Sequence, residues 1–136
     1  MQRTAKIFYV SLSLILSTSY ASAQTQSFNA HEVCKAGIGL VMGRDVSTIS
    51  AKSVENEVIL NYTRPDGDKF QYKCVLPPNS NRVLWAAWID GKWGRWRDTP
   101  ADGELTYRED NKKLVITETM PSASKPYSKK YRKSDF

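Results

Sequence analysis

All four tryptophans of this chain lie within the twelve residues from Trp85 to Trp96, and basic side chains are interleaved with them. An exposed group of indoles and arginines can stack on a sugar, anchor a partner protein or hold an anion. The same rings can instead complete the core of a small domain, and this is the simpler interpretation. The alternative is a partner-binding surface. Its candidate residues are Trp88, Trp93, Arg95, Trp96 and Arg97.

Alternation along a strand would divide this segment between two faces. We expect Trp88 to face away from the core, together with Arg82 and Leu84. Trp93 and Trp96 could fold back over the rim of the core. The residues expected on the core face are Val83, Trp85, Ala87 and Ile89.

Few residues could support catalysis. His31 is the single histidine, and its sequence neighbourhood supplies no partner for a general base. The carboxylate pairs Asp66 with Asp68 and Asp98 with Asp102 lie in turn-like segments, where acids usually face solvent. No motif for a serine nucleophile, a zinc site or a phosphate-binding loop occurs. The sequence therefore predicts a protein that is not an enzyme and that uses no cofactor or metal.

The chain has two cysteines, Cys34 and Cys74. Two thiols in a small exported domain most often pair, and neither has a second ligand in the spacing of a metal site. We therefore predict a disulfide, which should stabilise the fold by about 3–4 kcal/mol because it restricts the unfolded chain.

The first 23 residues have the form of a cleavable secretory signal peptide. Arg3 and Lys6 precede an apolar run of ten residues, 7–16, and Ala21-Ser22-Ala23 is a signal-peptidase site. A membrane span needs about 20 apolar residues, so we do not expect the chain to cross a membrane. Cleavage after Ala23 predicts a periplasmic or secreted protein.

The mature chain divides into a single domain, residues 24–120, and a basic tail, residues 121–136. Loss of the signal peptide lowers the net charge of +6 to +4, and the tail alone accounts for that +4. A neutral body argues against nucleic acid as a partner, whereas the tail could touch an anionic envelope surface or be solvated. We expect the tail to form an edge strand as far as Tyr131 and to be disordered after it.

The elements that must position these residues are one helix and a series of short strands. Asn29 and Glu32 form a predicted capping box at the helix start, and Gly43 is placed to end the helix. Gly37 on the apolar stripe predicts a close approach to a sheet. Period-two patterning and turn signals then predict six strands. These are 47–54, 57–63, 69–76, 82–89, 104–108 and 113–119.

The fold class predicted is α+β, with the N-terminal helix packed on an antiparallel meander of five or six strands. In the third strand Phe70, Tyr72, Cys74 and Leu76 share one face. A helix packed across that face would bring Cys34 to Cys74, so the patterning and the predicted disulfide agree.

Several motifs are similar to those of a group of small exported proteins of Gram-negative bacteria. They are C-K-A-G-I-G-L-V-M-G-R-D, Y-T-R-P-D-G-D, Y-K-C, N-R-V-L-W and G-R-W-R-D. The resemblance covers residues 28–119. It implies export and a helix-plus-meander layout, and it transfers no activity, ligand or site residue.

These observations predict a non-enzymatic periplasmic or secreted binding module. The first candidate role is a protein-interaction factor, such as an inhibitor, an immunity protein or an accessory subunit of an envelope or secretion system. The alternative is an envelope-glycan or peptidoglycan binder that uses residues 85–97. A small hydrolase is the second alternative.

Overall fold

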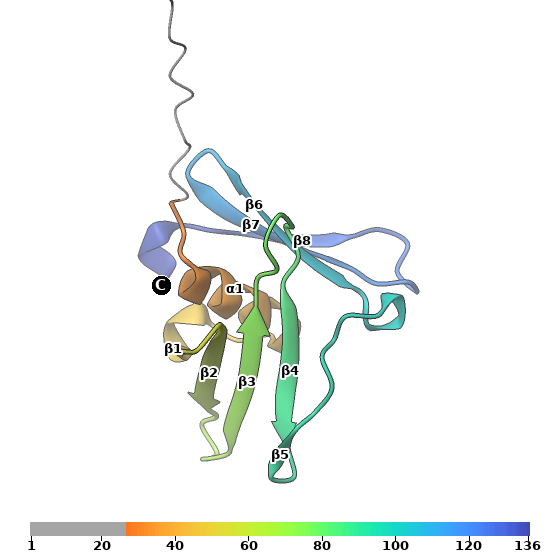
Figure 1. The fold of residues 1–136 in the computed structure, drawn as a ribbon. Coiled ribbons are helices and arrows are strands. Elements are labelled where there is room, and N and C mark those ends of the chain that lie inside the picture. The colour runs from red at the N-terminus through yellow and green to blue at the C-terminus, as the bar shows by residue number, and fades with distance from the viewer. Residues whose placement is uncertain (1–26) are drawn as a thin grey trace, which may run out of the picture.

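The computed structural model describes residues 27–136, so the predicted signal peptide and its cleavage site lie outside the described residues. One α-helix, α1 (Ala30–Met42), is followed by short strands and three 3₁₀-helices (Figure 1). The 3₁₀-helices are η1 (Val46–Thr48), η2 (Pro100–Asp102) and η3 (Lys133–Asp135). The strands are β1 (Ser50–Val54), β2 (Glu57–Thr63), β3 (Lys69–Val75), β4 (Leu84–Ile89), β5 (Lys92–Trp93), β6 (Glu104–Asp110), β7 (Lys113–Thr119) and β8 (Tyr127–Tyr131).

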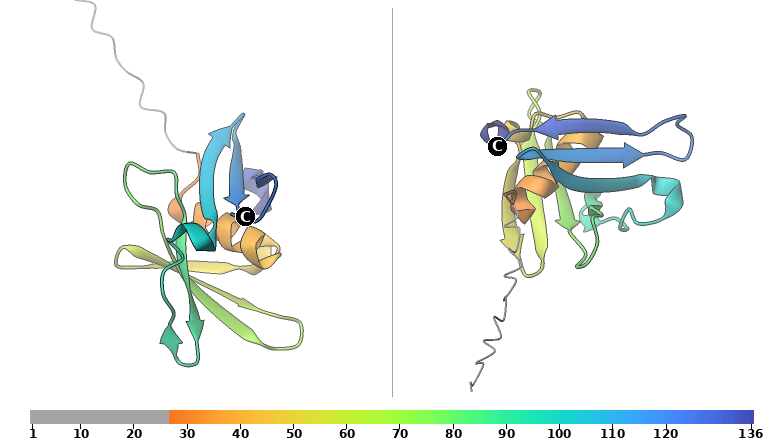
Figure 2. Two further views of the ribbon diagram at one scale, coloured as in Figure 1. Left: turned by 90° about the vertical axis from the view of Figure 1, so that its right-hand side faces the viewer. Right: turned by 90° about the horizontal axis from the view of Figure 1, so that it is seen from above.

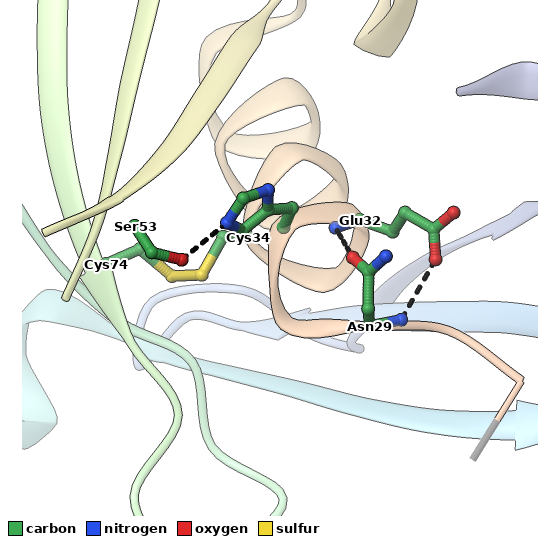
Figure 3. Close-up of a disulfide and its surroundings, with 6 residues drawn as sticks. Asn29, Glu32, Cys34, Ser53 and Cys74 are labelled. Carbon is green, nitrogen blue, oxygen red and sulfur yellow. Dashed lines mark hydrogen bonds between the residues drawn. A yellow bond between two sulfur atoms is a disulfide. The ribbon is translucent and has the colours of Figure 1, made fainter. Parts of the chain in front are cut away.

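Local chemistry sets both ends of α1, as the sequence predicts. The Asn29 side chain accepts a hydrogen bond from the Glu32 amide at 3.0 Å, and the Glu32 carboxylate accepts one from the Asn29 amide at 2.9 Å (Figure 3). These bonds satisfy amides that the first helical turn leaves without partners. The helix ends at Gly43, whose φ of 63° lies in the left-handed region that glycine adopts without strain.

Each strand pairs antiparallel with the next along the chain, within one sheet of order β1-β2-β3-β4-β5 and a second of order β6-β7-β8. The two sheets meet just before β4. There the amide of Val83 donates to the carbonyl of Leu105 at 2.8 Å, and the amide of Tyr107 donates to the carbonyl of Asn81 at 2.9 Å. The described strands therefore form a meander that bends sharply at β4 and encloses α1 from two sides (Figure 2).

The predicted α+β class is confirmed, with a helix packed against an antiparallel sheet and tied to it by a disulfide. Cys34 and Cys74 are bonded, with their Cα atoms 6.0 Å apart, and both are fully buried. The close approach at Gly37 is also confirmed. A Cβ atom there would lie 3.1 Å from Leu105 and 3.2 Å from Val83, side chains at the junction of the two sheets.

The structure has two strands besides the six in the predicted series. β5 is an addition to the first sheet, whereas β8 is the edge strand expected in the tail and ends at Tyr131 as expected. The expected disorder after Tyr131 is wrong. The chain forms η3 instead, and the ring of Phe136 packs against Phe28 at 6.0 Å between centroids. Lys133 fixes this end because its ammonium lies 2.7 Å from the Glu32 carboxylate.

Two strands begin later than expected. The strand expected from residue 47 starts at Ser50, because Asp45 accepts a hydrogen bond from the Ser47 amide at 2.9 Å and starts η1. The strand expected from residue 82 starts at Leu84, because the preceding residues pair with β6 across the junction. In both places a contact outside the periodic segment decides the boundary.

Candidate functional site

The five-stranded sheet has two faces with different surroundings. Its inner face packs against α1 and carries buried side chains such as Leu60, Tyr72 and Cys74. Because side chains alternate along a strand, the register places another set on the opposite, outer face. Within residues 27–136, no helix or strand lies over the outer face (Figure 2). The outer face carries Lys52, Ile59, Asn61, Gln71, Lys73, Ala86 and Trp88.

Two indoles stand together at one side of the outer face. Trp88 and Trp93 are register partners across the β4–β5 hairpin, and their ring centroids lie 5.1 Å apart with the planes at 81°. The hairpin turns tightly because Asp90 and Gly91 both adopt positive φ, of 51° and 78°. Trp88 remains 44% exposed. This edge-to-face pair is a rigid apolar surface that projects from the sheet.

Lys73 connects this pair to the third indole of the segment. Its ammonium lies 5.3 Å from the centroid of Trp93 and 4.5 Å from that of Trp96. The Glu57 carboxylate is 3.8 Å away, and the Lys73 side chain is only 15% exposed. An ammonium over an indole face is attracted by the ring quadrupole. Lys73 therefore fixes both rings and is itself covered by them.

The chain after β5 returns along the free edge of β4. The Gly94 amide donates to the Ala87 carbonyl at 2.8 Å, and the Arg97 amide donates to the Trp85 carbonyl at 2.7 Å. This return places Trp96 beside Lys73 on the outer face. Arg97 instead lies over the ring of Trp85, 5.5 Å from its centroid. The segment therefore contributes to both faces of the sheet.

The two candidate arginines converge on one carboxylate. Arg95 donates to the two Asp102 oxygens at 2.8 and 2.5 Å, and Arg97 lies 3.5 Å from the same group. Asp102 also accepts from the amide and hydroxyl of Thr99, and its side chain is 5% exposed. The hydrogen bonds from Arg95 and then Thr99 hold the pKa of Asp102 well below its usual value. Both arginines are thus engaged by one carboxylate within the chain, which balances one of their two charges.

The five residues predicted to form a partner-binding surface therefore fall into two groups. Trp88, Trp93 and Trp96 lie with Lys73 on the outer face, whereas Arg95 and Arg97 anchor the return segment to Asp102. Sequence reasoning missed Lys73. Lys73 lies opposite Ala86 because of the way β3 and β4 pair. The alternation in β3 predicts which face of the sheet Lys73 occupies, but not which residues lie beside it.

The expected core face of β4 is correct for most of its length. Val83 is buried, and Trp85 and Ala87 pack against the core. Ile89 is the exception, because it is 49% exposed. The prediction for Ile89 is wrong because this residue pairs with Lys92 in the hairpin at the end of the sheet. An exposed aliphatic side chain therefore follows Trp88 directly.

A shallow hollow of about 290 Å³ lies beside Trp88. Thr63, Lys69 and Phe70 line part of it, and the amide side chains of Asn61 and Gln71 line the side shared with the outer face. Amides both donate and accept hydrogen bonds. An indole edge with neighbouring amides can receive a polar ring-shaped group.

His31 has a partner that the sequence neighbourhood did not reveal. Its Nε2 lies 2.7 Å from the Ser53 hydroxyl of β1. Among the described residues no group hydrogen-bonds to the other ring nitrogen, and His31 is half-buried whereas Ser53 is exposed. A nucleophile and base pair needs an orienting group and an oxyanion site. The contact as it stands links the first turn of α1 to the edge of the sheet.

Each of the two carboxylate pairs considered for hydrolysis has at least one carboxylate engaged by arginine. Asp66 and Asp68 both bind Arg64, the second at 2.8 Å. Asp102 is bound by Arg95, as described above. Neither pair presents two free carboxyl groups across an open site. Within residues 27–136 no three or more histidine, cysteine or acidic side chains are grouped so as to hold a metal ion.

In the described part of the chain, no helix is both long enough and apolar enough to span a membrane. Comparisons with protein-family models, with curated proteins and with solved structures found no match.

Proposed function

We propose that this protein is a non-enzymatic binding module of the periplasm or the extracellular space, and that another protein docks on its outer face. The exposure of two adjacent large apolar side chains carries the proposal, with Trp88 44% and Ile89 49% exposed. Exposed tryptophans are over-represented among the anchors of protein interfaces. The buried disulfide is typical of proteins from oxidising compartments and supports the location.

The anchor is held in place before any partner arrives. Trp93 packs against the edge of Trp88, and Lys73 holds Trp93 and Trp96 together. A side chain that is already fixed loses little conformational entropy when it is buried. The rigidity of this cluster therefore favours tight binding over a surface of modest area.

The exposure of Ile89 supports a protein partner over a glycan. Its aliphatic side chain gains free energy when it is buried against apolar groups, and it offers no hydrogen bond to a sugar hydroxyl. Successive residues of a strand lie on opposite faces, so a partner must close around the end of the β4–β5 hairpin to cover both Trp88 and Ile89. The accessory subunit, inhibitor or immunity role that the sequence suggests requires such a partner.

The test is affinity capture from periplasmic extract of the native host, with mature protein as bait. One protein should be retained in stoichiometric amount by the wild type. Trp88→Ala and Ile89→Ala should each lower its affinity, and the Trp88 change by about 30-fold, which corresponds to about 2 kcal/mol. Thermal unfolding of the same variants shows whether they are folded.

Val54→Ala is the matched control. Val54 is an exposed apolar side chain, 45% accessible, on the far edge strand β1. Capture should be unchanged by this substitution. Equal loss with Val54→Ala, or capture that does not depend on Trp88 and Ile89, would contradict the proposed surface.

A glycan is the second candidate ligand, and the hollow beside Trp88 favours it. A sugar ring could stack on the indole while Asn61 and Gln71 bind its hydroxyls. Retention on purified peptidoglycan, lost with Gln71→Ala but kept with Ile89→Ala, would support the glycan over the protein partner. The opposite dependence would support the protein.

A further inference from the structure

A second, larger cleft lies on the helix side of the molecule. It has a volume of about 700 Å³ and forms where the C-terminal end of α1 and η1 face β8 and η3. Clefts of about 300–1,000 Å³ are the usual size for small-molecule sites. None of its lining residues belongs to the outer face, so this cleft is independent of the surface proposed for a partner.

Two cations that line this cleft form no close ion pair among the described residues, although the charge of Lys129 acts on Asp45 and Asp135 at longer range. Arg44 stacks over the ring of Tyr62, 5.2 Å from its centroid, and its Nε atom is buried without a hydrogen bond. Lys129 of β8 lies over the ring of Tyr131, 5.0 Å away. Aromatic rings pack against both cations, and the Nε atom of Arg44 still has no hydrogen-bond partner.

The carboxylates that line the same cleft are occupied locally. Asp45 accepts from the amide and hydroxyl of Ser47 at 2.9 and 2.8 Å. Asp135 accepts from the amide of Arg132 at 2.7 Å and from its guanidinium at 3.1 Å. Their oxygens are thus committed to η1 and η3. The third basic residue, Lys130, pairs with Asp110 at 3.6 Å.

An aromatic ring stands beside the two cations Arg44 and Lys129. Tyr127 lines the cleft and is 62% exposed, two residues before Lys129 on the same face of β8. The hydroxyls of Ser47 and Ser134 add hydrogen-bonding groups. The cleft therefore combines charge for an anion with a flat surface for a planar or ring-shaped group.

We propose that this cleft binds a small organic oxyanion, a phosphate or carboxylate attached to a ring. The anion lies between Arg44 and Lys129, and the ring lies against Tyr127. Charge-assisted hydrogen bonds from a guanidinium and an ammonium supply the affinity. The charges of Asp45 and Asp135 oppose an anion in this cleft, so binding depends on both cations together.

The test uses phenyl phosphate and benzoate as probes, with backbone amide shifts in NMR as the readout. Both probes should bind saturably and shift the amides of residues 44–47 and 127–131. Arg44→Gln and Lys129→Gln should each weaken binding at least about ten-fold, since a hydrogen bond to a charged group is worth that much. Phenol, which lacks the anion, should not bind.

Lys125→Gln is the matched control, because it removes the same charge from an exposed position of the β7–β8 loop outside the cleft. Binding that falls as much with Lys125→Gln as with Lys129→Gln would be non-specific attraction and would overturn the site. Lys129 is exposed, so its variant should fold even if Arg44→Gln does not. The proposed site would also be overturned if the protein bound neither probe saturably and did not bind the vesicles described next.

Vesicles containing phosphatidylglycerol separate the two sources of such an anion. Co-sedimentation that is lost with both Arg44→Gln and Lys129→Gln would place the oxyanion on a lipid headgroup. Binding of free phenyl phosphate without co-sedimentation would place it on a free small molecule. Either result supports the cleft, whereas co-sedimentation that neither variant changes would assign the contact to basic residues elsewhere.

Discussion

Trp85 and Trp88 lie on the same strand, three residues apart, and face opposite sides of the sheet. Trp85 belongs to the inner face, where its ring meets Tyr72 edge-on at 5.9 Å and packs against the core. Trp88 lies on the outer face, is 44% exposed and meets only the neighbouring indole at 5.1 Å. The same residue type thus has two roles, and its face in the sheet determines which.

The inner face holds the fold together through continuous packing. Rings of Phe70, Tyr62, Tyr72 and Trp85 follow one another with centroids 5.1, 6.0 and 5.9 Å apart. Burial is the main reason that the pKa of the Tyr72 hydroxyl is raised. On the outer face Ile59 and Ala86 are also buried, but Trp88 at its side remains exposed. Changes on the two faces should therefore separate stability from binding.

The largest expected effect is on the inner face, at the disulfide. Replacing Cys34 and Cys74 together by alanine frees a loop with a sequence separation of 40. On the chain-entropy account this should lower the free energy of unfolding by about 4 kcal/mol. Urea unfolding of the double variant, monitored by circular dichroism, measures the loss. A loss below about 1 kcal/mol would show that packing alone fixes α1 on the sheet.

A smaller effect is expected at the cation that organises the outer face. Lys73→Met keeps the length of the side chain and removes its interactions with Trp93, Trp96 and Glu57. Stability should fall by about 1 kcal/mol, and the near-ultraviolet circular dichroism of the indoles should weaken as they lose their fixed orientation. Lys69→Met, on the same strand and face, is the control, and equal effects of the two changes would contradict the role of Lys73.

The smallest effect concerns pH and the segment that returns along β4. Hydrogen bonds from Arg95 and then Thr99 hold the pKa of Asp102 below its ordinary value of 3.8. The stability that this lowered pKa contributes is therefore present above about pH 4 and is lost as the pH falls through the lower folded value. Asp102→Asn should flatten the fall in melting temperature below about pH 4. If the melting temperatures of wild type and variant fell in parallel with pH, this role of Asp102 would be contradicted.

The sequence predicted the elements whose signals are local. The helix caps at Asn29 and Gly43 and the strands β2 and β7 lie where capping and period-two patterns place them. The caps and these strands depend on residues within a few positions of one another, which is why a single sequence suffices for them. The disulfide joins residues with a sequence separation of 40 and is predicted instead from the presence of two thiols in a small exported domain, with which the helix stripe and the alternation in β3 agree.

The rest depends on contacts between distant parts of the chain. Lys73 meets Trp96 only after β3 and β4 have paired and the chain has turned back. Arg95 was expected to face a partner and instead meets Asp102 through an irregular loop that has no period. The cleft between Arg44 and Lys129 joins residues from opposite ends of the domain, and no sequence pattern marks it.

The two tryptophans of β4 provide the most direct test of the account. Trp85→Ala should lower the free energy of unfolding by about 3 kcal/mol, because it opens a cavity against the core. Trp88→Ala should lower it by less than about 1 kcal/mol, since much of that ring is already in water. Urea unfolding of both variants under one condition gives the comparison. Equal losses would make Trp88 a core residue and would leave the outer face without the anchor that the proposed function requires.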